Sequence, residues 1–357
     1  MNEIFVSAPG RACLFGEDQD YLGLSVITVA INLRTYVRGK ATEDNIIKIN
    51  YINTLEIDEF SIQEKIAYRS KRDYLRATIN ILKRDERFSN LLKGIECEIW
   101  SEIPIASGLS SSSVLVVAWA KFLNSAFGLN LGEKDIAQLA FQSEVAEFGE
   151  PGGMMDHIAS AIGGQLLIKC TNPPQIQKLD PPISGLVIGD TLVKKKTIET
   201  LVKRKSEIFE GIAFVSDQIK DFNLETVEMA RIEPYLQKMD GNAAKRLRAV
   251  LEMRDIVKMA APALKMDDEA KIGDLINRHH QSMRDGFENV IAKAEDMIRA
   301  SIDAGALGGK VTGSGNGGCV IIFAPQHQLE AAKAIEQAGG KDYIVQVDEG
   351  ARDEKPK

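Results

Sequence analysis

Apolar side chains recur along the chain with the two-residue period of a strand in some stretches and with helical spacing in others. The junction between one such strand and one such helix, at residues 95–122, is the most informative part of the sequence. Residues 95–100 (Ile-Glu-Cys-Glu-Ile-Trp) alternate apolar and polar side chains, which predicts a half-buried strand. Residues 114–122 are almost continuously apolar and predict a buried helix. The glycine- and serine-rich stretch 104–113 therefore predicts a turn from a strand into the N-terminus of a helix.

The same patterns, read along the whole chain, predict two domains of mixed helix and strand. Strands are expected at residues 4–8, 26–33, 165–169 and 320–323, and helices at 72–82, 132–149 and 326–338. Two Asx-Pro-Pro clusters, at residues 172–174 and 180–182, interrupt the pattern and indicate a change of domain. We therefore expect an N-terminal domain over 1–180 and a more helical C-terminal domain over 181–357.

The stretch 104–113 has the composition of an anion site. The first N–H groups of a helix lack internal partners, and the helix dipole adds partial positive charge there. Gly108 lets the backbone approach a ligand closely, and the four serines after Leu109 add hydroxyl donors, a combination that suits phosphate. The alternative is a serine-capped helix after an ordinary loop. Capping needs only one serine, so that alternative leaves the glycine and three serines without a role.

Two further segments carry carboxylates in unusual settings. Arg11 precedes a loop that holds Glu17, Asp18 and Asp20, and such a loop could hydrogen-bond several hydroxyls of a polyol. A solvated acidic turn explains the same loop equally well when it is taken alone. Asp156 follows a glycine-rich stretch at the point where a short helix is expected. It could be a functional carboxylate or an ordinary helix cap.

Composition and charge narrow the classes of protein. Apolar residues make up 44% and charged residues 27% of the chain, as in ordinary globular proteins, and the net charge is -7. We expect no nucleic-acid partner and no membrane partner, because the chain is acidic and no apolar run approaches 18 residues. The four cysteines are scattered, which argues against a disulfide framework or a zinc site and favours a cytoplasmic protein. The oligomeric state cannot be predicted.

Three ordered motifs together resemble the GHMP small-molecule kinases. The first is Gly10-Arg11 with Phe15-Gly16-Glu17 and Asp20-Tyr21, and the second is residues 104–113. The third is the glycine-rich segment 310–319, which includes Gly313, Ser314 and Gly315 and would be a weak signal alone. The resemblance covers almost the whole chain. It is greatest for galactokinases and related sugar kinases, because Glu144 lies twelve residues before Asp156.

The resemblance implies an α+β fold with a ribosomal-protein-S5-like N-terminal domain and a ferredoxin-like C-terminal domain. It implies an ATP-dependent kinase that phosphorylates a monosaccharide hydroxyl, the anomeric one in this branch. Mg²⁺ would be held by Ser112 and Glu144, with Asp156 as the base and Arg11 beside it. Glu17, Asp18, Asp20 and Gly153 would line the sugar site. ATP would lie against Pro104, Ser107, Gly108, Leu109, Ser110, Ser111, Ser112 and Ser113.

The chain also departs from the galactokinase pattern. Asp18 stands where a histidine is usual, and the region 200–204 (Thr-Leu-Val-Lys-Arg) lacks a tyrosine that precedes paired arginines. These differences put galactose itself in doubt without removing a catalytic group. A mevalonate-type kinase is an alternative. Mevalonate is itself an anion, however, and the two expected hydroxyl-binding acids, Glu17 and Asp20, argue against it. A non-catalytic sugar sensor is a second alternative, and the retention of Arg11, Ser112, Glu144 and Asp156 argues against it.

Overall fold

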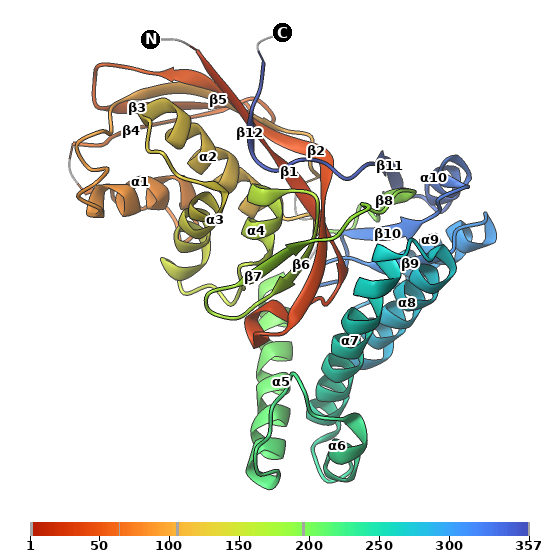
Figure 1. Ribbon diagram of the computed structural model, residues 1–357. Helices are drawn as coiled ribbons and strands as arrows, with labels where there is room; N and C mark the ends of the chain where they lie inside the picture. Colours follow the sequence, from red (N-terminus) through yellow and green to blue (C-terminus); the bar gives the residue numbers. More distant parts are fainter. Residues whose placement is uncertain (1–2, 64, 105–106, 195–196, 356–357) are drawn as a thin grey trace.

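The computed structural model describes residues 3–63, 65–104, 107–194 and 197–355. The described residues form two β-sheets, of eight and four strands, each covered by helices (Figure 1). The chain leaves the first sheet after Lys178 and enters the second at Leu186, close to the boundary expected from the proline clusters.

The first sheet has the order β12-β1-β2-β5-β3-β4, with β6 paired to β2 and β7 paired to β6. Only β3 and β5 run parallel among the strand pairs of the described residues. The strand bounds are β1 (Ile4–Phe15), β2 (Ser25–Ala41), β3 (Ile46–Tyr51), β4 (Glu56–Ser61), β5 (Ile95–Ser101), β6 (Gln165–Lys169), β7 (Gln175–Lys178) and β12 (Arg352–Asp353).

Strand β1 is longer than the sequence predicts. Pro9-Gly10 suggests the end of a strand, but β1 continues to Phe15 and pairs with β2 on both sides of a register shift between Pro9 and Gly10. Such an irregularity lets a sheet accommodate a proline, which cannot donate to the ladder. Arg11 consequently lies on a buried strand rather than in a loop, and its backbone position is fixed by the sheet.

Helices α1–α4 gather against the first sheet (Figure 1). Their bounds are α1 (Tyr74–Arg84), α2 (Ser111–Phe127), α3 (Glu133–Phe141) and α4 (Met155–Ile162), and a π-helical turn (Gln142–Ala146) follows α3. The apolar run predicted as a buried helix is α2, which packs on β1 and β2. Trp119 and Phe122 on α2 are fully buried and stack with ring centroids 5.8 Å apart. This packing fixes the N-terminus of α2 relative to Arg11 on β1.

The second sheet has the order β11-β8-β10-β9. Its strands are β8 (Leu186–Asp190), β9 (Gly308–Val311), β10 (Cys319–Phe323) and β11 (Lys341–Val345), with α9 (Ala292–Asp303) and α10 (Gln328–Gln337) packed beside them. Helices separate β8 from β9 and β10 from β11, which gives the βαββαβ order and strand arrangement of a ferredoxin-like domain. The expectation of a ferredoxin-like C-terminal domain is therefore confirmed.

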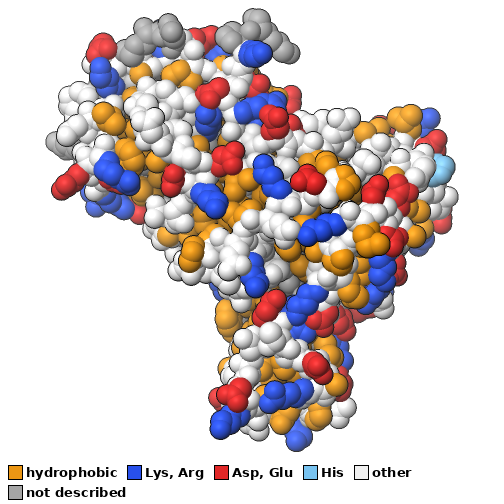
Figure 2. Space-filling view, viewed as in Figure 1, with side chains coloured by type: hydrophobic (Ala, Val, Ile, Leu, Met, Phe, Trp, Pro, Cys, Tyr) orange, Lys and Arg blue, Asp and Glu red, His pale blue; other side chains and the backbone are white. Residues whose placement is uncertain are grey.

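Helices α5–α8 lie between β8 and α9, and part of them projects from the body of the molecule as an arm (Figures 1 and 2). The bounds are α5 (Thr197–Gln218), α6 (Met229–Leu236), α7 (Gly241–Lys265) and α8 (Glu269–Gln281), followed by a π-helical turn (Ser282–Phe287). No helix in the described part of the chain is both long enough and apolar enough to cross a bilayer. Basic and acidic side chains are interspersed over the face seen in Figure 2.

The end of the chain returns to the N-terminal domain. Strand β12 pairs with the start of β1, and both termini lie at the same end of the first sheet (Figure 1). Arg34, which is 2% exposed, binds this segment through Asp348 Oδ2 at 2.7 Å and Gly350 O at 2.8 Å. The last ten described residues thus belong structurally to the first sheet, although the sequence places them in the second domain.

Candidate active site

Asp156 lies in the first turn of α4, where both of its carboxylate oxygens have partners. Arg11 on β1 donates through Nε to Oδ1 at 2.7 Å, and its Nη2 lies 2.7 Å from the same oxygen. Ser110 donates its hydroxyl to Oδ2 at 2.5 Å. Burial alone would raise the pKa of Asp156, but Arg11 and Ser110 outweigh burial and hold the pKa below its usual range. Asp156 is therefore an ionised, oriented acceptor at neutral pH.

Arg11 also ties Asp156 to the loop before α2. Its Nη1 donates to Gly108 O at 2.6 Å, and its backbone N–H donates to Leu109 O at 3.4 Å. Gly108 has a φ of 88°, in the left-handed region that favours glycine. One guanidinium thus links Asp156 to the backbone turn that precedes α2.

Helix α2 begins at Ser111, three residues before the apolar run, so its first turn consists of serines. Ser111 and Ser112 are accessible, and Gly108 is half-buried next to them. The other candidate ATP-binding residues support the loop: Ser107 donates to Pro104 O at 2.7 Å, the Leu109 side chain is fully buried, and the Ser110 hydroxyl is taken by Asp156. The geometry favours backbone N–H groups of Gly108 and the first turn, with the Ser112 hydroxyl, as the anion-binding donors.

Glu144 sits in the π-helical turn after α3, against the same first turn. It is 7% exposed, and the Ser112 and Ser113 hydroxyls near it favour its charged form. His157 Nε2 lies 2.8 Å from Glu144 Oε2. Burial opposes ionisation of Glu144, yet His157 and the two serines lower its pKa, so the carboxylate is charged at neutral pH.

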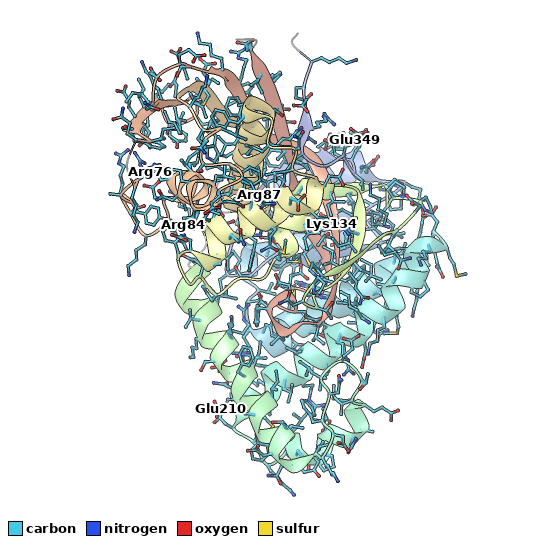
Figure 3. All side chains as sticks on the ribbon, turned by 60° about the vertical axis from the view of Figure 1, so that its left-hand side comes forward. Arg76, Arg84, Arg87, Lys134, Glu210 and Glu349 are labelled. Atoms are coloured by element: carbon cyan, nitrogen blue, oxygen red, sulfur yellow. The ribbon has the colours of Figure 1, made fainter. Side chains whose placement is uncertain are left out.

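Glu147 directly follows the π-helical turn that carries Glu144, but its side chain has other partners. It accepts two hydrogen bonds from Arg84, at 2.7 and 2.8 Å, and one from the Tyr68 hydroxyl at 2.5 Å. Arg84 lies at the end of α1, on the outer side of the N-terminal domain (Figure 3). These contacts, those of Arg84 first, lower the pKa of Glu147 to about 2. The structure thus separates a site-facing Glu144 from a Glu147 that fastens two helices together.

The acidic loop after β1 does not present its carboxylates equally. Glu17 is 1% exposed and forms an ion pair with Lys310 on β9, whose Nζ also donates to Cys13 O at 3.0 Å. His279 on α8 accepts from Gly16 N at 2.9 Å, and its Nε2 lies 3.3 Å from Glu17 Oε2. The Glu17 carboxylate is thus held inside the protein, and the expectation that it binds a sugar hydroxyl stays a prediction. Glu17 instead fixes the loop against the C-terminal domain.

Asp18 and Asp20 are partly buried in the same loop. Asp18 has a φ of 59° and forms an ion pair with Arg204 on α5. Asp20 lies against Gly153, where an added Cβ would be 2.1 Å from Asp20 Oδ2. Burial, together with Asp156 and Asp18, raises the pKa of Asp20 to about 6. No cation of the described chain lies within ion-pair distance of Asp20, which leaves its carboxylate for hydroxyl donors.

The glycine-rich segment near the end of the chain joins these parts. Gly313 and Gly315 have positive φ, and Ser314 O accepts from Arg204 Nη2 at 3.1 Å and from Asn289 Nδ2 at 3.0 Å. Cys319 N donates to Ser107 O at 2.7 Å. The segment therefore contacts both the loop before α2 and the arginine that holds Asp18. A role of residues 313–315 in binding substrate stays a prediction.

Four residues around the site had no predicted role. Lys310 belongs to the glycine-rich segment 310–319, and His157 directly follows Asp156. Their positions next to predicted site residues are the signal in the sequence that points to them. His279 and Arg204 gave none, because each meets its partner across more than 180 positions of sequence.

Comparisons with known proteins identify the family of this chain. Family models for the GHMP kinase N-terminal and C-terminal domains match residues 73–164 and 260–343. The chain belongs to the GHMP kinase family. Within that family, the galactokinase galactose-binding signature matches residues 1–40, so the chain is most similar to galactokinases.

Individual relatives agree with this placement. The galactokinase of Haemophilus influenzae is 31% identical over 98% of this chain and 94% of its own length. The mevalonate kinase of Thermococcus sibiricus is 30% identical and covers 98% of both chains. The crystal structure of Lactococcus lactis galactokinase complexed with galactose has a TM-score of 0.87 at 24% identity, over 98% of this chain and 95% of that one. The last comparison shows a shared fold.

Proposed function

We propose that this chain is an ATP-dependent sugar kinase that transfers the γ-phosphate of ATP to the anomeric hydroxyl of a neutral monosaccharide. The observation that carries the proposal is the meeting of Asp156, Arg11 and the first turn of α2, with the carboxylate of Asp20 beside them. A phosphate bound at the helix N-terminus and a hydroxyl bound at Asp156 would be adjacent, as in-line transfer requires.

In this mechanism Asp156 accepts the proton of the attacking hydroxyl as the new oxygen–phosphorus bond forms and the bond to the leaving ADP breaks. The low pKa of Asp156 suits a loose transition state, in which proton transfer comes late. Ser110 gives its present hydrogen bond to the oxygen that faces the substrate, so the incoming hydroxyl shares or replaces that bond. Arg11 keeps the carboxylate oriented and places positive charge next to the transferring group.

A magnesium ion fits the contact between Ser112 and Glu144. Both offer hard oxygen donors, and the Ser112 hydroxyl lies close enough to Glu144 to help lower the pKa of that carboxyl. The described residues contain no cluster of three or more His, Cys, Asp and Glu that would form an all-protein metal cage. Two protein ligands, completed by phosphates and water, are the usual arrangement for Mg²⁺ in kinases. The ion would supply charge neutralisation at the phosphates, and Ser112 and Glu144 would hold it.

The site supports a neutral sugar better than mevalonate. Arg11, Arg204 and Lys310 each have a carboxylate partner, and Asp20 adds a negative charge without one. An anionic acceptor would meet this excess of negative charge, whereas a sugar offers hydroxyl donors to Asp20.

The test is a screen of ATP consumption with free monosaccharides and with mevalonate as acceptors, followed by identification of the phosphorylated carbon by ³¹P and ¹³C spectroscopy. We expect turnover with at least one neutral sugar and phosphate on its anomeric oxygen. Turnover with mevalonate and with no sugar would refute the proposal. Tight sugar binding without any turnover would instead identify a sensor.

A further inference from the structure

The Asp18–Arg204 ion pair joins the two domains at the sugar side of the site. Asp18 lies in the loop between β1 and β2, and its side chain is 10% exposed. Arg204 comes from α5 in the C-terminal domain, and its side chain is 3% exposed. One oxygen of Asp18, Oδ2, accepts from Arg204 Nη1. A pair this well buried fixes the positions of both groups.

Arg204 is held from three directions. Besides Asp18, its Nη2 donates to Ser314 O at 3.1 Å, and its guanidinium carbon lies 5.1 Å from the centroid of the Phe287 ring. The cation therefore keeps its place even if Asp18 loses its charge, because the carbonyl and the ring face remain as partners.

The pair lies on the side of the site that the C-terminal domain forms. Asp20, two positions after Asp18 in the same loop, lies against Gly153, which lies just before the helix that carries Asp156. Tyr21 closes the same side: its ring interacts with Lys205 at 4.6 Å, and its buried hydroxyl has no hydrogen-bond partner among the described residues. A sugar whose anomeric hydroxyl sits at Asp156 thus extends past Asp20 toward Asp18 and Arg204.

We propose that Asp18 acts as a charge mask on Arg204, so that the far end of the sugar site accepts neutral sugars and rejects sugars that carry a carboxylate there. This inference rests on the proposed sugar-kinase function. With Asp18 ionised, a substrate carboxylate meets a negative charge in front of the arginine, and like charges in contact are strongly disfavoured. With Asp18 neutral, Arg204 becomes a cation available for a carboxylate, a charge-assisted pairing that arginine makes well.

The test compares a neutral hexose with the uronic acid that differs from it only by oxidation of C6. The hexose is the one that ranks first in the acceptor screen, and both compounds are assayed for kcat/KM and for binding without ATP by calorimetry. For the wild-type enzyme we expect strong preference for the hexose. Asp18→Asn should shift the kcat/KM ratio toward the uronic acid by about 10- to 100-fold, mainly through a lower KM and Kd for the acid.

Two further variants make the result specific. The double variant Asp18→Asn with Arg204→Met should lose the gain for the uronic acid, because the unmasked cation is gone. Asp58→Asn removes the carboxylate of another partly buried Arg–Asp pair, with Arg76 on the outer side of the N-terminal domain (Figure 3), and should leave the ratio unchanged. Asn suits the left-handed backbone at position 18, so Asp18→Asn should fold, and a thermal melt checks this.

Failure of the charge mask and failure of the sugar-kinase function give different results. An unchanged ratio in folded Asp18→Asn would overturn the charge mask, and so would a gain that survives in the double variant. A wild-type enzyme that already accepts the uronic acid as well as the hexose would also overturn it. Wild-type protein that turns over no neutral sugar would refute the sugar-kinase function itself.

Discussion

His157 Nε2 lies 2.8 Å from Oε2 of Glu144, and both side chains are buried beside the first turn of α2. His157 also directly follows Asp156, so one turn of α4 carries both the proposed base and the group that orients the proposed metal ligand. Partners that hold a metal ligand in place typically contribute 10- to 100-fold to metal affinity or activity. His157 is therefore a positioning residue for Glu144.

The first prediction concerns this contact. His157→Phe should raise the Mg²⁺ concentration needed for half-maximal activity by about 10-fold or more, because Glu144 loses a fixed partner. His157→Gln, which keeps a donor, should restore much of the effect. Mn²⁺ binding in the presence of ATP, followed by electron paramagnetic resonance, gives a readout independent of turnover.

His280→Gln is the matched control. His280 Nε2 lies 3.2 Å from Glu295 Oε1, in a contact that does not involve the site residues. Equal Mn²⁺ affinity in wild type and His157→Phe would show that the contact has no part in metal binding.

The second prediction is that Asp156→Asn lowers kcat by about 10²–10⁴, the usual contribution of a general base. Asn keeps the shape of Asp but cannot take the proton. Nucleotide affinity, measured by calorimetry, should change little. Asp156 hydrogen-bonds with Arg11 and Ser110, whereas the proposed phosphate site is the first turn of α2. A variant with near wild-type kcat would remove Asp156 from the mechanism.

The third prediction follows from the pKa of Asp20, which burial and two neighbouring carboxylates raise to about 6. A raised carboxyl pKa means that the folded protein binds the proton more tightly than the unfolded chain does, so stability falls as pH rises from about 4 to 6. Asp20→Asn should remove this loss and stabilise the ligand-free protein above pH 6 by at most about 3 kcal/mol.

The same variant should lose sugar affinity, because the amide cannot replace a carboxylate acceptor for two hydroxyls. In the wild type, KM for the sugar should rise as pH falls below about 6, while KM for ATP changes less. Urea unfolding and steady-state kinetics across pH 5–8 check both effects. A variant that is less stable than wild type at pH 7.5 would contradict the assignment.

The fourth prediction concerns the buried cluster of Glu17, Lys310 and His279. Lys310→Met leaves a carboxylate without its cation in a fully buried site and should cost about 3–5 kcal/mol of stability. Adding Glu17→Gln should recover part of that loss, since the isolated charge is then removed. Additive costs in a double-mutant cycle, measured by urea denaturation, would show that the two groups are not coupled.

Local sequence patterns predicted the elements that bear most of the chemistry. The apolar run marked α2 because a helix buried on all sides leaves a continuous signal, and the alternation at 95–100 marked β5. The short helix expected to begin near Asp156 is α4. These features depend on neighbours in sequence, which a pattern can register.

The parts that could not be predicted depend on distant partners. Glu17 was expected at the sugar, but Lys310, 293 positions away, binds it inside the protein. The first strand was expected to end before Arg11, because nothing in Pro9-Gly10 shows that β2 continues the pairing past a register shift. The Asp18–Arg204 pair likewise needs α5 to be placed first.

The return of the chain end to the first sheet has a consequence for biosynthesis. The N-terminal domain leaves the ribosome first, yet the groups that hydrogen-bond buried Arg34 lie 314 and 316 positions after it and are made much later. Domains that emerge early normally fold as units during translation. Here the early domain must wait, with an incomplete edge at β1, until residues 346–354 have cleared the exit tunnel. Loss of residues 346–354 would thus damage a distant part of the chain, the domain that carries Arg11 and Asp156.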